Sequence, residues 1–276
     1  MVKERLDVLL VSRNIFESRE QAQRAIMAGE VLVNDIRITK TGTKVNDDVN
    51  VRYTGKSLPY VSRGGLKLKK AIDTFSICFS GKIVLDIGAS TGGFTDCALK
   101  HGAGKVYSLD VGYGQLAWSL RNDSRVVVME RTNARELNPG MFREKLDIIT
   151  IDVSFISITK ILPKLPVLIN DDGLIVTLLM PQFEAGREHV GKKGVVKDKD
   201  IHISVIKNIV GEAEKSGLFA VKLDYSPIKG PEGNIEFLLL LNTSNKVEID
   251  EKIIHQTVQA SQEIGDQLSE VRGQKK

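Results

Sequence analysis

A glycine-rich stretch from Lys82 to Thr95 constrains the fold of this chain more than any other segment. It reads KIVLDIGASTGGFT: a short apolar run, a carboxylate at Asp86, a loop with three glycines, and then apolar positions at helical spacing. A strand, a glycine-rich turn and a helix in this order grip nucleotide-type cofactors at the edge of a parallel sheet. Glycines let the backbone approach the ligand, and the helix start supplies N–H donors. The stretch therefore predicts a cofactor site.

The chain after Lys82 alternates between predicted strands and predicted helices. Continuous apolar runs, typical of strands in a sheet covered on both faces, occur at Ile83–Leu85, Val106–Asp110, Val126–Glu130, Asp147–Asp152, Gly173–Leu179, Phe219–Tyr225 and Glu236–Leu241. Helices are predicted between them, among others at Gly114–Arg121, Ile158–Leu168 and Ile201–Ser216. The fold class is therefore α/β, with a doubly wound sheet. Residues 249–271 place apolar side chains on one helical face, which predicts a packing or partner helix.

The first fifty residues predict a separate small α+β unit. A short helix is expected within Arg5–Ser12, and a second helix that Ser18 caps and Gly29 ends. A hairpin turning at Asn34-Asp35 and a strand at Asp48–Tyr53 complete the unit. We therefore expect a first domain over residues 1–53, a linker over 54–60, a catalytic domain over 61–245 and a C-terminal helix or tail over 246–276.

Composition excludes several classes of protein. Apolar residues at 42% and charged residues at 27% describe an ordinary globular protein. The longest apolar runs fall far short of the roughly 20 residues that cross a bilayer, and the N-terminus has no apolar signal core. The two cysteines form neither a disulfide framework nor a metal cluster. We expect a cytoplasmic protein with no metal and no membrane partner.

The positive charge is concentrated at the N-terminal end. Residues 1–70 hold 14 Lys and Arg against 8 Asp and Glu, a net of +6, whereas the remainder has 25 basic and 27 acidic residues. A basic end of this kind is expected where a chain meets a polyanion, although a solvated surface can carry a modest excess too.

The carboxylate at Asp86 favours one cofactor over another. No P-loop sequence is present, which leaves a nicotinamide dinucleotide or S-adenosylmethionine. A carboxylate beside the loop would repel a pyrophosphate but favour a sulfonium and an ammonium, and so predicts S-adenosylmethionine. Asp110, after the next strand, suits ribose hydroxyls, and Asn133 could flank the adenine. The predicted cofactor-binding residues are Asp86, Gly88, Ala89, Ser90, Gly92, Gly93, Phe94, Thr95, Asp110, Asn133 and Asp152.

Two sets of motifs resemble known families. The N-terminal pattern RLD…SREQA…IMAGEVLVN resembles the RNA-binding module named after ribosomal protein S-four. The resemblance implies that cations of this unit face RNA phosphates; a solvated helix face is the alternative. With Arg63 from the basic stretch that follows the linker, the predicted RNA-binding residues are Arg5, Ser18, Arg19, Arg24, Lys44 and Arg63.

The second resemblance extends from the N-terminus to about Asn242. The motifs SRGG at 62–65, DIGASTGGFTD at 86–96, DVSFIS at 152–157, PQFE at 181–184 and GNIEF at 233–237 resemble the TlyA family. These proteins are called haemolysins but act as ribosomal RNA 2′-O-ribose methyltransferases, with a Rossmann-like, FtsJ-like catalytic domain behind the RNA-binding module. The resemblance implies a partner, ribosomal RNA or ribosomal subunits, and S-adenosylmethionine as cofactor.

The resemblance also implies a catalytic Lys-Asp-Lys-Glu tetrad. Carried over to this chain, it gives Lys67, Asp152 and Glu236, but Met180 stands where the family has its second lysine. A thioether cannot take up a proton at neutral pH, so we expect strongly reduced activity with cofactor and RNA binding retained. Rescue by Lys192 or Lys193, on a segment rich in glycine, is an alternative.

Three rival functions are weighed against methyl transfer. A non-catalytic RNA- or ribosome-binding protein is compatible with Met180. A membrane-lytic activity lacks a segment of membrane length or a strongly cationic amphipathic face. An oxidoreductase that uses a nicotinamide cofactor is the weakest alternative.

Overall fold

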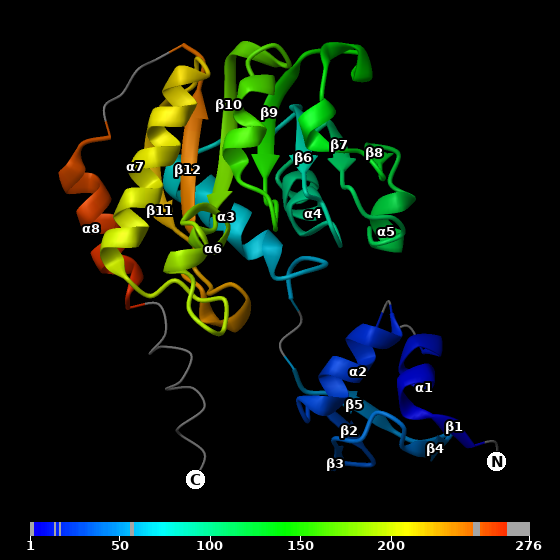
Figure 1. The fold of residues 1–276 in the computed structure, drawn as a ribbon. Helices are drawn as coiled ribbons and strands as arrows, with labels where there is room; N and C mark the ends of the chain where they lie inside the picture. Colours follow the sequence, from blue (N-terminus) through cyan, green and yellow to red (C-terminus); the bar gives the residue numbers. More distant parts are fainter. Residues whose placement is uncertain (1–2, 14, 17, 56–57, 245–248, 264–276) are drawn as a thin grey trace. The chain divides into compact units, whose positions relative to one another are not determined.

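The structure is a computed structural model that describes residues 3–13, 15–16, 18–55, 58–244 and 249–263 (Figure 1). The chain divides into two compact units, Met1–Pro59 and Tyr60–Lys276. Each unit has hydrophobic core residues of its own.

The first unit packs two short helices on small antiparallel sheets. Strands β3, β2 and β5 form one sheet, and β1 pairs with β4. The Asn34-Asp35 turn of the predicted hairpin has positive φ at both residues, 48° and 62°, as a two-residue hairpin loop requires. The elements are β1 (Lys3–Arg5), α1 (Leu6–Ser12), α2 (Arg19–Met27), β2 (Val31–Val33), β3 (Ile36–Ile38), β4 (Lys44–Asn46) and β5 (Val51–Tyr53).

Predicted and observed boundaries differ in two places in this unit. Arg5 belongs to β1 rather than to the first helix, and the strand predicted at Asp48–Tyr53 is confined to β5. Strand β4 was missed because only Val45 is apolar in its three residues. Ser18 caps α2 as predicted, since its side chain accepts a hydrogen bond from the Gln21 N–H.

The second unit contains a sheet of seven strands within the described residues, in the order β11-β12-β10-β9-β6-β7-β8. Neighbouring strands are parallel from β10 to β8, whereas β12 is antiparallel to β10 and β11. The order reverses at β6, because β7 lies on one side of it and β9 on the other. The carboxyl ends of β6 and β9 therefore form a topological switch point, where α/β sheets bind ligands.

The elements of this unit follow the predicted alternation. They are α3 (Gly64–Phe75), β6 (Ile83–Ile87), α4 (Gly93–Lys100), β7 (Lys105–Leu109), α5 (Trp118–Arg121), β8 (Val126–Met129), η1 (Ala134–Glu136), η2 (Pro139–Met141), β9 (Leu146–Ile151), η3 (Ile158–Lys160), η4 (Leu162–Lys164), β10 (Ile169–Leu179), α6 (Pro181–Glu184), η5 (Arg187–His189), α7 (Lys199–Lys215), β11 (Phe219–Tyr225), η6 (Pro231–Gly233), β12 (Phe237–Asn242) and α8 (Glu251–Ser261).

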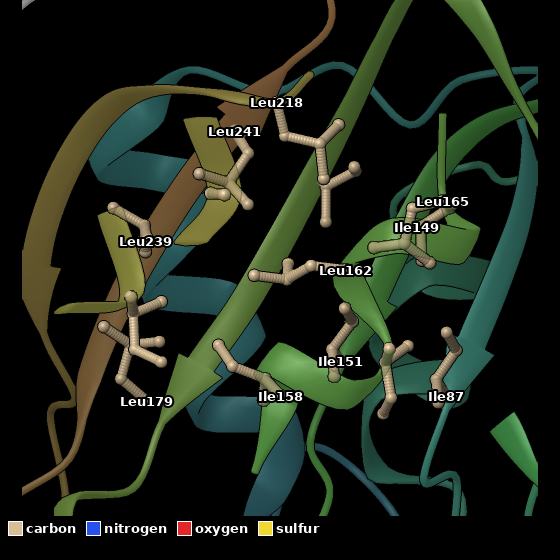
Figure 2. Close-up of a cluster of buried hydrophobic side chains, with 14 of the residues drawn as sticks. Ile87, Ile149, Ile151, Ile158, Leu162, Leu165, Leu179, Leu218, Leu239 and Leu241 are labelled. Carbon is tan, nitrogen blue, oxygen red and sulfur yellow. The ribbon is translucent and has the colours of Figure 1, made fainter. Parts of the chain in front are cut away.

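Apolar side chains cover both faces of the sheet. Along β12, Leu239 and Leu241 belong to the cluster on the face covered by α7 and α8 (Figure 2), whereas Leu238 and Leu240 belong to the cluster that includes α3 and α4. Successive side chains of a strand point to opposite faces. A fully apolar strand such as β12 is therefore buried on both sides, as the apolar runs predicted.

Two helix predictions need correction, and a third is tested only in part. The segment Ile158–Leu168 forms two 3-10 turns, η3 and η4, instead of one helix, because Pro163 and Pro166 lack N–H donors and restrict the residues before them. The helix expected at Gly114–Arg121 is reduced to α5, and Gly114 has a φ of 72°. The last helix, α8, ends at Ser261, and the predicted face beyond residue 263 lies outside the described residues.

Candidate active site

The glycine-rich loop after β6 requires glycine where it meets the end of β9. Gly88 has a φ of 85°, and a Cβ there would lie 2.2 Å from the carbonyl oxygen of Asp152. The N–H groups of Gly88 and Ala89 both donate to the carbonyl of Leu109, at 2.8 and 3.0 Å, which ties the loop to β7. The loop is thus hydrogen-bonded to the end of β7 and packed against the end of β9, the two strands that flank β6 at the switch point.

The starts of α3 and α4 also approach each other through glycine. A Cβ on Gly93 would lie 2.3 Å from the Ser62 hydroxyl and 2.9 Å from the Gly65 nitrogen. Between these backbones is a cavity of about 430 Å³, within the usual size range of small-molecule sites. Its lining residues are Ser62, Arg63, Gly64, Lys67, Gly88, Ala89, Ser90, Gly93, Phe94, Asp152, Ile228, Lys229, Gly230 and Glu232.

A lysine and two carboxylates meet at this cavity. Lys67 of α3 places its Nζ 2.8 Å from Glu236 Oε2 and 3.7 Å from Asp152 Oδ2. Asp152 directly follows β9 and Glu236 directly precedes β12, so three separate elements bring together the residues that the resemblance implied. Burial raises the pKa of both carboxyl groups, and the Lys67 ammonium opposes that rise. Burial thus favours the protonated form of both carboxyl groups, and the lysine favours the ionised form.

The Glu236 carboxylate is only partly compensated. Its side chain is fully buried, and its Oε1 accepts no hydrogen bond from any residue in the described part of the chain. Met180 directly follows β10, the strand between β9 and β12, and is 5% exposed in the apolar cluster on the α3 and α4 face. Among the described residues, Lys67 is the one cation that forms ion pairs with these two carboxylates, and the lysine that the resemblance implies at position 180 stays a prediction.

Asp86 lies behind the cavity wall rather than on it. Its carboxylate accepts hydrogen bonds from the hydroxyls of Thr95 (2.7 Å) and Thr150 (3.0 Å), and Ser108 lies 2.8 Å from Thr95. Burial raises the pKa of Asp86 to about 6, although the two hydroxyls oppose the rise. Asp86 thus joins β6, α4 and β9 through buried hydrogen bonds. Its contact with a cofactor stays a prediction.

Other predicted cofactor residues also take local structural roles. Asp110 accepts the N–H groups of Ser90 (2.8 Å) and Gly112 (2.7 Å), and Asn133 caps η1. Of the predicted set, Gly88, Ala89, Ser90, Gly93, Phe94 and Asp152 line the cavity, whereas Asp86, Gly92, Thr95, Asp110 and Asn133 do not.

The sequence prediction missed one wall of the cavity. Ile228, Lys229, Gly230 and Glu232 belong to the loop before β12, and the guanidinium of Arg63 donates to the carbonyl of Lys229 at 2.8 Å. The sequence signal was present, because Gly230 and Gly233 lie shortly before Glu236. A Cβ on Gly230 would lie 2.1 Å from Glu236 Oε1, so this glycine lets the loop close over the carboxylate.

An exposed aromatic side chain follows Asp152 in the chain. Phe155, three residues after Asp152, is 91% exposed and has a φ of 66°. Its ring centroid lies 5.1 Å from that of Phe183 in α6. A bulky residue in the left-handed region is uncommon and indicates a functional constraint.

In the first unit, a buried carboxylate arranges the predicted RNA-binding arginines. Asp7 is fully buried and accepts hydrogen bonds from Arg5, Arg19 and Gln23, which hold its pKa well below the usual range. Arg5 and Arg19 remain about half exposed, and Arg24 and Lys44 are exposed. Ser18 serves as the α2 cap. The four cations predicted to bind RNA in this unit are therefore accessible to solvent.

The fold and the site define a class of protein. A sheet with this strand order and a glycine-rich loop at its switch point is a Rossmann-like α/β domain. Residues 60–243 match the model of the FtsJ-like methyltransferases, and residues 4–51 match that of the S4 domain.

Known proteins with similar sequences support the same assignment. The chain is 42% identical to the 16S/23S rRNA (cytidine-2′-O)-methyltransferase TlyA of Mycobacterium tuberculosis, over 92% of this chain and 95% of the relative. It is 47% identical to Hemolysin A of Brachyspira hyodysenteriae, over 85% and 98%. A solved Streptococcus thermophilus structure named for hemolysins is 44% identical, with a TM-score of 0.77, over 98% and 99%. The chain belongs to the FtsJ-like methyltransferase family and, within it, to the TlyA group that carries an N-terminal S4 domain.

Proposed function

We propose that this protein transfers a methyl group from S-adenosylmethionine to a ribose 2′-hydroxyl of ribosomal RNA. The observation that carries the proposal is the Lys67, Asp152 and Glu236 group at the edge of the cavity. The name of the Mycobacterium tuberculosis relative specifies the same bond, a cytidine 2′-O position in 16S and 23S rRNA.

The cavity fits S-adenosylmethionine. Backbone at Gly64, Gly88 and Gly93 borders it where side chains would fill the space, and Asp152 brings negative charge that favours a sulfonium or ammonium. These residues, with Ser90 and Phe94, would hold the cofactor. When bound, S-adenosylmethionine supplies an electrophilic methyl group on its sulfonium.

The side chains around the cavity have distinct tasks in this proposal. Lys67, oriented by Glu236, can hold the 2′-hydroxyl in position, and positioning removes up to roughly 7–11 kcal/mol of barrier in favourable cases. Phe155 offers an exposed ring on which the base of the target nucleotide can stack. The exposed cations of the first unit would bind RNA phosphates.

Met180 limits proton removal in this proposal. Assisted proton transfer typically contributes a factor of about 10² to 10⁴, and the methionine side chain cannot provide it. We therefore expect the protein to bind cofactor and RNA but to methylate slowly. Oε1 of Glu236, which has no hydrogen-bond partner among the described residues, is a potential partner for a lysine at position 180.

The test is methyl transfer to ribosomal subunits, followed by mass spectrometry of nuclease digests. Wild type and the Met180→Lys variant are compared, with Met180→Leu as an apolar control and calorimetry of S-adenosylmethionine binding for each. We expect Met180→Lys to raise the rate at least tenfold and Met180→Leu to leave it low. Equal rates for wild type and Met180→Lys would contradict impairment. If neither methylates a 2′-oxygen although both bind RNA, the protein is a non-catalytic RNA-binding member of its family.

A further inference from the structure

Lys192 and Lys193 form the tip of a tight turn between α6 and α7. The Gly194 N–H donates to the Gly191 carbonyl at 2.8 Å, and the Gly191 N–H donates to the Val195 carbonyl at 3.1 Å. Both lysines are exposed, and neither forms an ion pair with another residue that the structure describes. Two adjacent like charges at the tip of a turn contribute nothing to packing.

Asn234 connects the base of this turn, by hydrogen bonds, to the loop before β12 that lines the cavity. Asn234 is 3% exposed; its side chain donates to the Gly194 carbonyl at 2.8 Å and accepts the Val196 N–H at 3.1 Å. Its own carbonyl accepts the Gly230 N–H at 2.9 Å. In Figure 1 the yellow-green segment after α6 and the orange loop before β12 lie side by side. The turn is therefore built beside the loop that leads to Glu236.

A second contact holds the turn from the other side. The buried His202 of α7 places its Nε2 3.0 Å from the Val196 carbonyl. With Asn234, His202 fixes the backbone of Val196 on both its N–H and its carbonyl. The two lysines therefore project from a turn whose base is hydrogen-bonded on both sides.

None of the nearby carboxylates forms an ion pair with Lys192 or Lys193 in the part of the chain that the structure describes. Glu188 of η5 faces His189 at 3.8 Å, and Asp198 caps α7 by accepting the Asp200 N–H at 2.8 Å. Glu232 lines the cavity, and Asp152 and Glu236 are paired with Lys67. The charge of Lys192 and Lys193 is thus left for a partner outside the chain.

We infer that the Gly191–Gly194 turn binds RNA phosphates beside the target nucleotide, through Lys192 and Lys193. This inference rests on the proposed function, because the ribose that reaches Lys67 must bring its flanking phosphates past the mouth of the cavity. Lysine ammonium groups contact phosphates without reading sequence, and such contacts position a nucleic acid. The turn is a positioning element for the RNA and takes no part in proton transfer.

The test is binding of the full-length chain to deproteinised 23S ribosomal RNA at several KCl concentrations. The Lys192→Ala/Lys193→Ala variant is compared with Lys192→Arg/Lys193→Arg, which keeps the charge. The matched control is Lys145→Ala/Lys164→Ala, which removes the same charge from exposed lysines. These lie by the starts of β9 and β10, the edge opposite the site. We expect the turn variant to bind roughly tenfold more weakly near 0.15 M salt, with a shallower salt dependence by about 1.4 to 1.8 for two lost contacts.

Turnover provides a second readout, measured both with Met180 in place and in the Met180→Lys background. The turn variant should raise KM for RNA and leave kcat and the S-adenosylmethionine Kd unchanged. A fall in affinity no larger than in the control, or an Arg pair as weak as the Ala pair, would overturn the inference. A loss of kcat with unchanged RNA affinity would also overturn it, because it would assign the lysines to catalysis. Failure of methylation itself leaves the binding comparison valid, so the two proposals fail separately.

Discussion

At the scale of single residues, the site is shaped by buried charges that are unequally compensated. Lys67 faces two carboxylates whose pKa values are raised by burial. Asp86, behind the wall, is also kept from water, and hydroxyl donors rather than a cation stabilise it. Leaving charged groups in such places costs folding free energy. That cost should be visible in the pH dependence of stability.

We predict that Asp86 destabilises the folded protein as the pH rises. Its folded-state pKa of about 6 lies above the ordinary value of 3.8, so the folded state binds this proton more tightly than the unfolded state. The contribution to stability is full below pH 4 and is lost as the pH rises through 6, by about 3 kcal/mol. Asp86→Asn does not titrate. Relative to wild type, it should therefore gain about that amount between pH 4 and pH 8.

Urea unfolding of both proteins across this pH range, followed by circular dichroism, measures the difference. Parallel stability curves for wild type and Asp86→Asn would contradict the prediction, because they would mean that Asp86 has an ordinary pKa.

At the scale of elements, the cavity depends on how closely α3 and α4 approach each other. Gly93 begins α4 against Ser62 and Gly65, and Gly88 lets the loop touch the end of β9. The absence of a side chain at Gly88 and Gly93 thus lets α3, α4 and the end of β9 come together. One added methyl group at either glycine would push these elements apart. By contrast, a Cβ on Gly211 within α7 would meet no heavy atom within 4 Å apart from its chain neighbours and the backbone of its own helix.

We predict opposite effects for alanine at these two glycines. Gly93→Ala should lower the free energy of unfolding by about 1–3 kcal/mol, since overpacking shifts the backbone, and should weaken S-adenosylmethionine binding at least tenfold. Gly211→Ala should raise stability by about 0.5–1 kcal/mol, since alanine is the better helix former, and leave binding unchanged. Chemical denaturation and calorimetry check both. Unaltered cofactor affinity in Gly93→Ala would show that the α3–α4 approach does not form the site.

At the scale of the whole molecule, the chain consists of two units with separate cores. The first unit is centred on residues such as Leu6, Leu10 and Ile26, and the second unit packs apolar side chains on both faces of its sheet. A unit of about 59 residues buries a smaller share of its surface than a larger one, and is correspondingly less stable.

We predict that the units unfold separately and respond differently to the two ligands. A ligand stabilises only the units that it binds in the folded state. Ribosomal RNA, which contacts both units in the proposed function, should therefore protect amides of both units from hydrogen exchange, whereas S-adenosylmethionine should protect only those of residues 60–243. Exchange in increasing urea, measured by mass spectrometry, should show the first unit opening earlier. One shared transition, shifted equally by either ligand, would contradict this prediction.

Much of the fold could be predicted from the sequence because the signals are local. Apolar runs marked the seven strands, the helix cap at Ser18 was correct, and the glycine-rich loop follows β6 as expected. The exceptions are also local. Pro163 and Pro166 break a helix that periodicity predicted, and β4 has too few apolar residues to show a period.

The candidate site was predicted only in part, since it depends on contacts between distant segments. Lys67, Asp152 and Glu236 were found by resemblance, but their meeting at 2.8 and 3.7 Å is a product of strand order. The loop Ile228–Glu232 was missed as a cavity wall, and so was the connection of Asn234 to the lysine turn.

The sequence by itself determined the α/β alternation, the glycine-rich loop and the substitution at Met180, because propensity, periodicity and residue identity are properties of short segments. Only the tertiary structure decided that Asp86 lies behind the wall, that Oε1 of Glu236 has no partner among the described residues, and that Lys192 and Lys193 are held beside the cavity. Burial and pairing are properties of what surrounds a side chain, and the sheet brings those surroundings from strands far apart in the chain.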